Sequence, residues 1–183
     1  MDELSLIASA RTGQAASFNR LIEAHQDMIY SVAYHLLGQA DGAVKATEEA
    51  FLTAYRALPA YRGGSFQIWL LRIVIRACHK NLTRRRNNTT IIPKYPEGQG
   101  AEMEMAQVIG AGICGLPWKQ RVTLVLADVQ GLSHEEVAQV TGWAPAEVGR
   151  RLAEARGRLR DWLYGSGPGT RCTLRASATC RET

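Results

Sequence analysis

The chain has 183 residues, which is enough for one ordinary domain or two small ones. Hydrophobic residues make up 46% of it and charged residues 21%, a balance that predicts a folded protein and excludes an intrinsically disordered one. The formal net charge of +5 favours a polyanionic partner.

The first residues, "MDELSLIASARTG", are acidic and polar and lack the basic and then apolar pattern of a signal peptide. The uncharged stretch near residues 106–118 is too short and too rich in glycine to span a bilayer. We therefore expect a cytoplasmic protein without membrane insertion.

Three helices are predicted in the N-terminal half. Apolar residues at helical spacing span residues 18–36, and "LLGQADG" closes that helix. A second helix covers residues 43–58 and ends before Pro59. A third, over residues 65–86, is apolar around much of its circumference, which is typical of a helix in the middle of a bundle.

The junction between the second and third of these helices combines aromatic, basic and glycine residues. They are Tyr61, Arg62, Gly63, Gly64 and Ser65 in the loop, and Phe66, Trp69, Arg72 and Arg76 in the helix. Arginines neutralise phosphates and an unstacked base can lie on an aromatic ring, so the set favours a site for single-stranded nucleic acid. The alternative is that Phe66 and Trp69 are core residues and the arginines are solvated. For Phe66 alone we favour the core.

Residues 87–100, "NNTTIIPKYPEGQG", contain two prolines and no helical period, which predicts a linker. Helices are expected again over residues 102–114 and 117–129. The predicted fold class is all-α. Two small helical domains, residues 1–88 and 102–164, are joined by a flexible linker at residues 89–101 and followed by a flexible tail at residues 165–183.

Residues 131–163 carry the pattern of two helices joined by a tight turn. Ser133 and Glu136 have the spacing of a capping box. Gly142 suits the left-handed end of the first helix, and Pro145 suits the first turn of the second. Because the second helix is rich in arginine, the pair predicts a helix-turn-helix whose second helix enters a DNA major groove.

The same stretch has a second interpretation. Arg150, Glu154 and Arg158 are spaced by four residues and could form a salt-bridged solvent face. A helical hairpin with that face would bind nothing. From this stretch alone, both interpretations stay open.

The four cysteines form no C-x-x-C pair. Cys78 and Cys114 lie within predicted helices and are expected to be buried free thiols. Cys172 and Cys180 lie in the predicted tail, where a redox- or metal-sensitive segment is one hypothesis and a tail with idle thiols is the favoured one. Two thiols are half a zinc site, so we predict no metal and no cofactor.

The chain combines two nucleic-acid-binding features with two small helical domains. In this combination it resembles an extracytoplasmic-function sigma factor, a class of bacterial promoter-recognition subunit. The similarity covers about residues 4–164. It rests on "DMIYSVAYHLLG", "EEAFLTAYRALPAYRGGSFQIWLLRI" and the closing "RRR" in the first predicted domain, and on "LPWKQRVTLVLADVQGLSHEEVAQVTG" in the second.

The resemblance implies that the first domain binds core RNA polymerase and captures a base flipped out of the single-stranded −10 element. The polymerase-binding residues would be Lys45, Glu48, Glu49, Phe51 and Leu52. The −10 contacts would be the nine loop and helix residues named above, from Tyr61 to Arg76.

The resemblance also implies that the second domain binds the duplex −35 element. The residues concerned would be Ser133, His134, Pro145, Glu147, Arg150, Arg151, Glu154 and Arg156. An anti-sigma factor is a further implied partner. No catalytic residue is implied, so the protein would initiate transcription without being an enzyme.

The chain departs from the family pattern at two sites. Family members usually carry acidic residues where this chain has Gly42 and Lys45. The recognition helix usually resembles "VKSRLHRAR", whereas here it is "VGRRLAEAR". Promoter choice should therefore differ from that of commoner members.

Two other functions can be compared with this one. A helix-turn-helix regulator that does not dock on core polymerase is favoured by Gly42 and Lys45. An enzyme is disfavoured because the four histidines are scattered and form no H-E-x-x-H motif, and because no glycine-rich phosphate loop or G-x-S-x-G motif is present.

Overall fold

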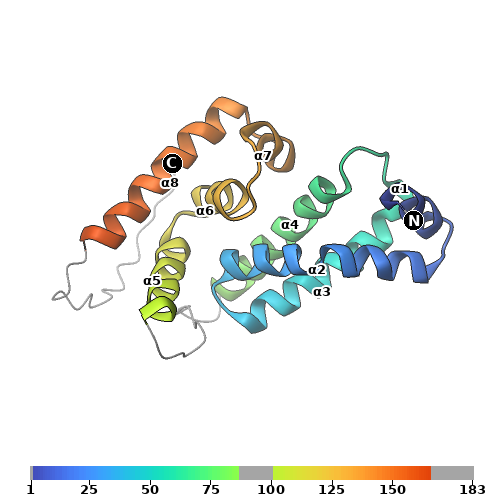
Figure 1. Cartoon of the computed structure of the whole chain (residues 1–183), viewed down its shortest axis with the longest axis horizontal. Coiled ribbons are helices and arrows are strands. Elements are labelled where there is room, and N and C mark those ends of the chain that lie inside the picture. Colours follow the sequence, from blue (N-terminus) through green and yellow to red (C-terminus); the bar gives the residue numbers. More distant parts are fainter. Residues whose placement is uncertain (1, 87–100, 166–183) are drawn as a thin grey trace.

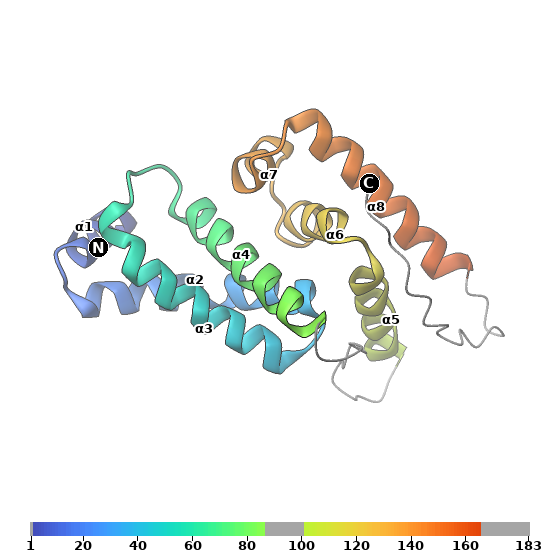
Figure 2. The same ribbon diagram turned by 180° about the vertical axis from the view of Figure 1, so that it is seen from behind.

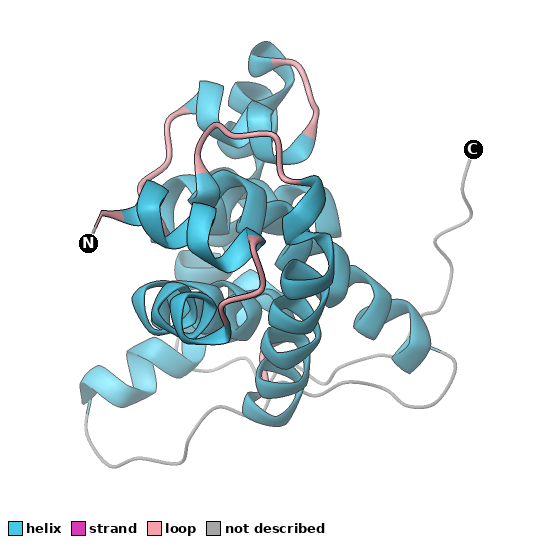
Figure 3. Ribbon diagram, turned by 90° about the vertical axis from the view of Figure 1, so that its right-hand side faces the viewer, coloured by secondary structure: helices cyan, strands magenta, loops and turns pink. Residues whose placement is uncertain are grey.

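The structure is a computed structural model that describes residues 2–86 and 101–165 of the chain. All regular elements in these residues are helical, and none is a strand (Figures 1 and 3). The elements are α1 Glu3–Arg11, α2 Ala15–Leu37, α3 Ala40–Ala57, η1 Leu58–Ala60, α4 Phe66–Arg86, α5 Ala101–Gly115, α6 Trp118–Leu124, η2 Val125–Val129, α7 His134–Thr141 and α8 Pro145–Gly165. The predicted all-α class is confirmed. The predicted linker lies outside the described residues except for Ala101, and the predicted tail except for Gly165.

The helices α2, α3 and α4 pack against one another and form the first half of the core (Figure 2). Their fully buried side chains include Leu21, Ile29, Leu36, Phe66, Leu70, Leu71 and Val74. Full burial of one such side chain contributes about 1.5–3 kcal/mol. Because α4 contacts α2, α3 and also α7, its predicted central position is confirmed.

The N-terminal helices differ from the sequence prediction at their starts, and α2 begins at Ala15, three residues before the expected start. The short helix α1 was not predicted, since it buries only Ile7 and Ala10 against the rest of the chain. The helix α3 begins at Ala40, three residues before the expected start, and Asp41 lies in its first turn, where a negative charge favours the helix. The end of α2 is as predicted, because Gly38 closes it with a φ of 70°.

The second half of the structure is built around α8, which packs against α5, α6 and α7. The predicted local chemistry of the helix-turn-helix is confirmed. The Ser133 hydroxyl accepts a hydrogen bond from the Glu136 amide, and the Glu136 carboxylate accepts one from the Ser133 amide. Gly142 ends α7 with a φ of 78°, and Pro145 is the first residue of α8. The predicted helix over residues 117–129 is α6 followed by the single π-helical segment η2.

The two halves touch along the C-terminal part of α2 and between α4 and α7. Arg121 of α6 donates hydrogen bonds to the carbonyl oxygens of Leu36 in α2, at 2.7 Å, and of Leu116, at 3.0 Å. The thiol of Cys114 lies 3.9 Å from the carbonyl oxygen of His35. These bonds satisfy carbonyl groups that the ends of α2 and α5 leave without helical partners. The assignment of residues 1–88 and 102–164 to separate domains stays a prediction.

The cysteines of the described residues are free. Cys78 is fully buried, as predicted, and burial raises the pKa of its thiol to about 12 because the thiolate would lose its hydration. Cys114 is only partly buried. Cys172 and Cys180 lie outside the described residues. No described helix is both long enough and apolar enough to cross a membrane.

Candidate functional site

An apolar groove of about 520 Å³ lies between α2 and α3. It is lined by Ala15, Phe18, Asn19 and Ile22 from α2 and by Glu48, Phe51, Leu52 and Tyr55 from α3. The side chains of Leu52 and Tyr55 are exposed there, Leu52 at 57%. An exposed apolar surface with an aromatic ring and one carboxylate at its edge is typical of a protein-binding site.

Three of the five predicted polymerase-binding residues, Glu48, Phe51 and Leu52, come together in this groove. The other two do not. Glu49 forms an ion pair with Lys80 of α4, and Lys45 is exposed but does not line the groove. The sequence analysis missed Tyr55, although its position four residues after Phe51 places both on one face of a helix.

Three of the predicted −10 contacts, Tyr61, Phe66 and Trp69, form an aromatic cluster at the ends of the loop. Tyr61 and Phe66 are both buried, and the ring of Tyr61 lies 5.8 Å from that of Phe66 and 5.2 Å from that of Trp69. The hydroxyl of Tyr61 donates a hydrogen bond to the carbonyl oxygen of Gly64 at 2.7 Å. Phe66 is therefore a core residue, as we favoured for it alone. Tyr61 supports the loop through its hydrogen bond to Gly64, and its buried ring is not available to stack on a base.

The exposed part of the loop consists of Arg62, Gly63, Gly64 and Ser65. Gly63 and Gly64 have φ values of 92° and 95°, a conformation that side chains with a Cβ atom rarely adopt. The Ser65 hydroxyl accepts a hydrogen bond from the amide of Ile68 at 3.3 Å and so caps α4. The loop thus presents one cation, Arg62, beside one stretch of backbone without side chains, Gly63 and Gly64.

Arg72 and Arg76 lie exposed on α4, on the side that faces the second half of the structure. The Nε–H of Arg72 donates a hydrogen bond to the carbonyl oxygen of Gln139 in α7 at 2.9 Å. Arg76 lines a hollow of about 460 Å³ with His79 of α4 and Trp118 of α6, whose rings lie 5.2 Å apart. Arg72 and Arg76 are therefore accessible cations, but α7 already contacts Arg72.

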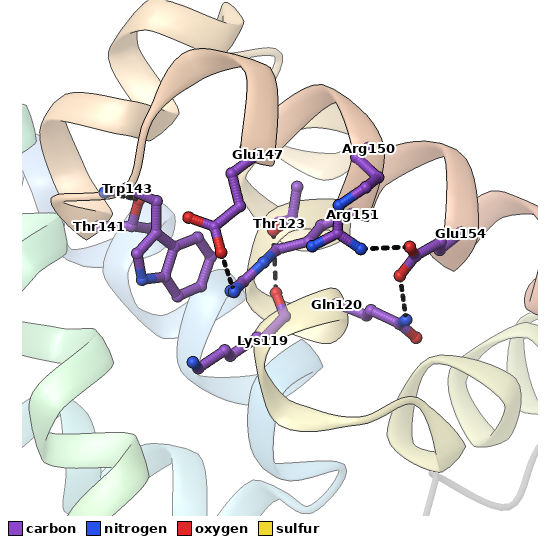
Figure 4. Close-up of polar contacts among 9 residues, drawn as sticks. All are labelled: Lys119, Gln120, Thr123, Thr141, Trp143, Glu147, Arg150, Arg151 and Glu154. Atoms are coloured by element: carbon purple, nitrogen blue, oxygen red, sulfur yellow. Dashed lines mark hydrogen bonds and ion pairs between the residues drawn. The ribbon is translucent and has the colours of Figure 1, made fainter.

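The two neighbouring arginines of α8 have different surroundings (Figure 4). The side chain of Arg150 is 61% exposed and pairs with Glu154. Arg151 is only 8% exposed, because its guanidinium lies over the ring of Trp143, 4.2 Å from the ring centroid, and pairs with Glu147. Arg151 and Glu147 thus brace the corner between α7 and α8, and Arg151 does not lie on the exposed face where a DNA contact was expected.

The other predicted −35 residues are placed as follows. Ser133 is engaged in the cap of α7, and the exposed His134 lies beside Gly149 of α8. Pro145 is exposed at the start of α8. Arg156 is turned toward η2, where it donates two hydrogen bonds to Asp128 at 2.6 and 3.0 Å. Of the eight predicted residues, Arg150 and Glu154 are the long polar side chains that the exposed face presents.

No group of three or more histidine, cysteine or carboxylate side chains that could hold a metal ion occurs among the described residues.

Comparison with known proteins places both halves of the chain in one superfamily. The family model for sigma-70 region 2 matches residues 21–88, and that for sigma-70 region 4 matches residues 107–159. The chain is 30% identical to the ECF RNA polymerase sigma factor SigM of Mycobacterium tuberculosis, over 88% of this chain and 84% of that protein. It is also 30% identical to the ECF RNA polymerase sigma factor SigE of Mycolicibacterium smegmatis, over 86% of this chain and 66% of that protein.

Solved structures show the same fold. The complex of CnrH with the cytosolic domain of CnrY matches with a TM-score of 0.72 at 22% identity, covering 91% of this chain and 99% of that one. The sigma factor RpoE of Bartonella quintana, in complex with the anti-sigma factor NepR, matches with a TM-score of 0.69 at 20% identity, covering 82% of this chain and 98% of that one.

Proposed function

Because the chain belongs to the extracytoplasmic-function family of RNA polymerase sigma factors, we propose that it directs core polymerase to promoters by contacting both the −10 and the −35 element. The observation that carries this proposal is that one chain holds an apolar docking groove, a basic loop and a helix-turn-helix. Its role is regulatory rather than enzymatic, and it acts in the cytoplasm, where polymerase meets the chromosome.

The α2–α3 groove is the proposed contact with core polymerase. Phe51 and Leu52 supply apolar anchors, and Glu48 supplies a charge at the rim. Protein interfaces usually have such an apolar centre with a polar rim. Lys45 lies outside the groove, so its reversed charge leaves these anchors in place. This arrangement supports docking over the alternative of a regulator that does not bind polymerase.

The loop before α4 is the proposed −10 site. Arg62 and the open backbone of Gly63 and Gly64 are exposed, while the aromatic cluster fixes both ends of the loop. Extrusion of a base costs a few kcal/mol and must be offset by contacts made only to the flipped base. Trp69, which is partly exposed, and the phosphate-binding Arg72 and Arg76 complete the site.

The helix α8 is the proposed −35 reader, with α7 as its brace. An anti-sigma factor is a proposed further partner. The Bartonella quintana relative of similar fold is known in such a complex, which supports this part of the proposal.

The test is transcription in vitro by the full chain with core polymerase on genomic fragments, together with a polymerase-binding assay. Leu52→Asp should weaken polymerase binding at least about tenfold, because it places a charge in the apolar groove. Leu4→Asp is the matched control, since Leu4 is also exposed but lies on α1, outside the groove. A parent chain that binds promoter DNA specifically but never binds polymerase would instead support the regulator.

A further inference from the structure

The exposed face of the first half of α8 carries few side chains that can hydrogen-bond to a base. Its small residues are Pro145, Ala146, Gly149 and Ala153, and Gly157 follows in the next turn. Arg151 is turned onto Trp143 and Arg156 onto Asp128, so neither points from this face. Within this first half, Glu147 is paired with Arg151, which leaves Arg150 and Glu154 as the long polar side chains on the exposed face. The exposed Arg158 lies one turn beyond them.

The small residues allow this face to come close to DNA. Gly157 lies inside α8, and no atom lies within 4 Å of the position that a Cβ atom would take there. Glycine inside a helix costs about 1 kcal/mol relative to alanine, and no packing among the described residues explains its presence at position 157. Close approach of the helix backbone to a ligand is an established use of glycine.

Glu154 is held as a charged acceptor. The side-chain amide of the buried Gln120 in α6 donates a hydrogen bond to one oxygen of Glu154 at 2.9 Å, and Arg150 pairs with the other oxygen (Figure 4). The hydrogen bond from Gln120, and then that from Arg150, lower the pKa of Glu154, so that it is a carboxylate at neutral pH. The buried position of Gln120 also limits the directions in which the carboxylate can point.

We propose that, in the −35 element bound under the proposed function, Glu154 reads a cytosine and Arg150 reads a guanine in the neighbouring base pair. A carboxylate has about four acceptor positions, of which Gln120 and Arg150 use two. It can therefore accept a further hydrogen bond from the N4 amino group of cytosine. Adenine also offers an amino group, but its N7 acceptor lies beside it and repels the carboxylate.

Arg150 supplies the second of the two proposed base contacts. Its guanidinium has five N–H donors, of which the pair with Glu154 uses one. The remaining donors match the O6 and N7 acceptors of guanine. The Arg150 cation also offsets the repulsion between the Glu154 carboxylate and the DNA phosphates.

The experiment uses holoenzyme reconstituted from the full chain and core polymerase. A promoter found by transcription of genomic fragments is randomised at every −35 base pair, and the bound or transcribed sequences are counted. The parent should prefer one cytosine by about 5- to 150-fold, the range expected for one base contact. Glu154→Ala should abolish that preference and keep the guanine preference, whereas Arg150→Ala should do the reverse.

Glu154→Gln should move the preference at that position from cytosine to adenine, because a side-chain amide pairs with adenine. Arg160→Ala, near the far end of α8, is the control and should keep every preference. The proposal is overturned if Glu154→Ala keeps the cytosine preference, or if it relaxes only the guanine preference, since Glu154 would then merely position Arg150. Failure of the parent to transcribe any fragment would count against the proposed function instead.

Discussion

The Nε atom of Arg72 in α4 lies 2.9 Å from the carbonyl oxygen of Gln139 in α7. A cation that we assign to the −10 phosphates is thus bonded to the helix-turn-helix, 67 residues further along the chain. Because the acceptor is a backbone carbonyl, no side-chain substitution at position 139 removes it. The four N–H groups on the two terminal nitrogens of Arg72 remain available to a phosphate, so α7 holds this side chain in place without excluding a contact with −10 DNA.

Arg72→Ala should reduce the salt dependence of promoter binding by the holoenzyme. Loss of one phosphate contact lowers the slope of log K against log salt by about 0.7–0.9. The stability of the free chain should fall by only about 0.5–1.5 kcal/mol, the net value of one hydrogen bond. Binding isotherms at several salt concentrations measure the first quantity and urea denaturation the second. An unchanged slope with reduced stability would show that Arg72 serves only the contact with α7.

The adjacent arginines of α8 should differ in their effect on stability. Arg151→Ala removes the cation over Trp143 and leaves Glu147 unpaired, so the free energy of unfolding should fall by about 1–3 kcal/mol. Arg150→Ala should change it by no more than about 0.5 kcal/mol, because its ion pair is exposed. Urea denaturation of both variants provides the comparison. Equal losses would contradict the bracing role of Arg151.

The sequence contained more information about α8 than the prediction used. Arg151 lies three residues after Val148 and four before Ala155, both fully buried, so helical spacing already placed it beside the buried face. The resemblance to the family instead led to the prediction that Arg151 contacts DNA. The capping box of Ser133 and Glu136 was predictable because its parts are three residues apart and need no tertiary contact.

Long-range relationships were beyond such reasoning. The α2–α3 groove joins Phe18 to Tyr55, whose rings lie 5.0 Å apart, and the contact of Arg72 with Gln139 joins the two halves of the structure. Neither follows from a periodicity, because each depends on how separate helices pack. The burial of Tyr61 was missed for the same reason, since an aromatic residue in a loop has the same local pattern whether it faces a base or the core.

Gly112 of α5 lies where α8 crosses most closely. A Cβ atom there would lie 2.6 Å from Leu159 and 2.8 Å from the indole of Trp162, whose Nε1–H donates to the carbonyl oxygen of Val108. Gly112→Ala should therefore be less stable than Gly157→Ala by about 1–3 kcal/mol, the cost of overpacking. Gly157→Ala meets no atom within 4 Å and should gain about 0.5–1 kcal/mol. Thermal denaturation compares them, and equal melting temperatures would show that the two helices separate without cost.

The loop before α4 provides the last prediction. Its two ends are fixed by the Tyr61 hydroxyl, which is bonded to Gly64, and by Ser65, which caps α4. A double substitution of Arg62 and Ser65 would therefore mix the loss of a DNA contact with the loss of a helix cap. The two effects separate in single variants, because Arg62 is exposed.

Arg62→Ala should reduce promoter opening by about tenfold or more, since hydrogen bonds to a charged group contribute about 1.5–3 kcal/mol. Its binding to core polymerase should be unchanged, because the α2–α3 groove is made of other residues. Ser65→Ala should instead lower the stability of the free chain by about 1 kcal/mol and still open the promoter at moderate temperature. Permanganate reactivity of unpaired thymines measures opening, and a polymerase-binding assay runs beside it. Normal promoter opening by Arg62→Ala would show that Arg62 takes no part in base capture. A loss of polymerase binding would show that the loop supports the docking surface.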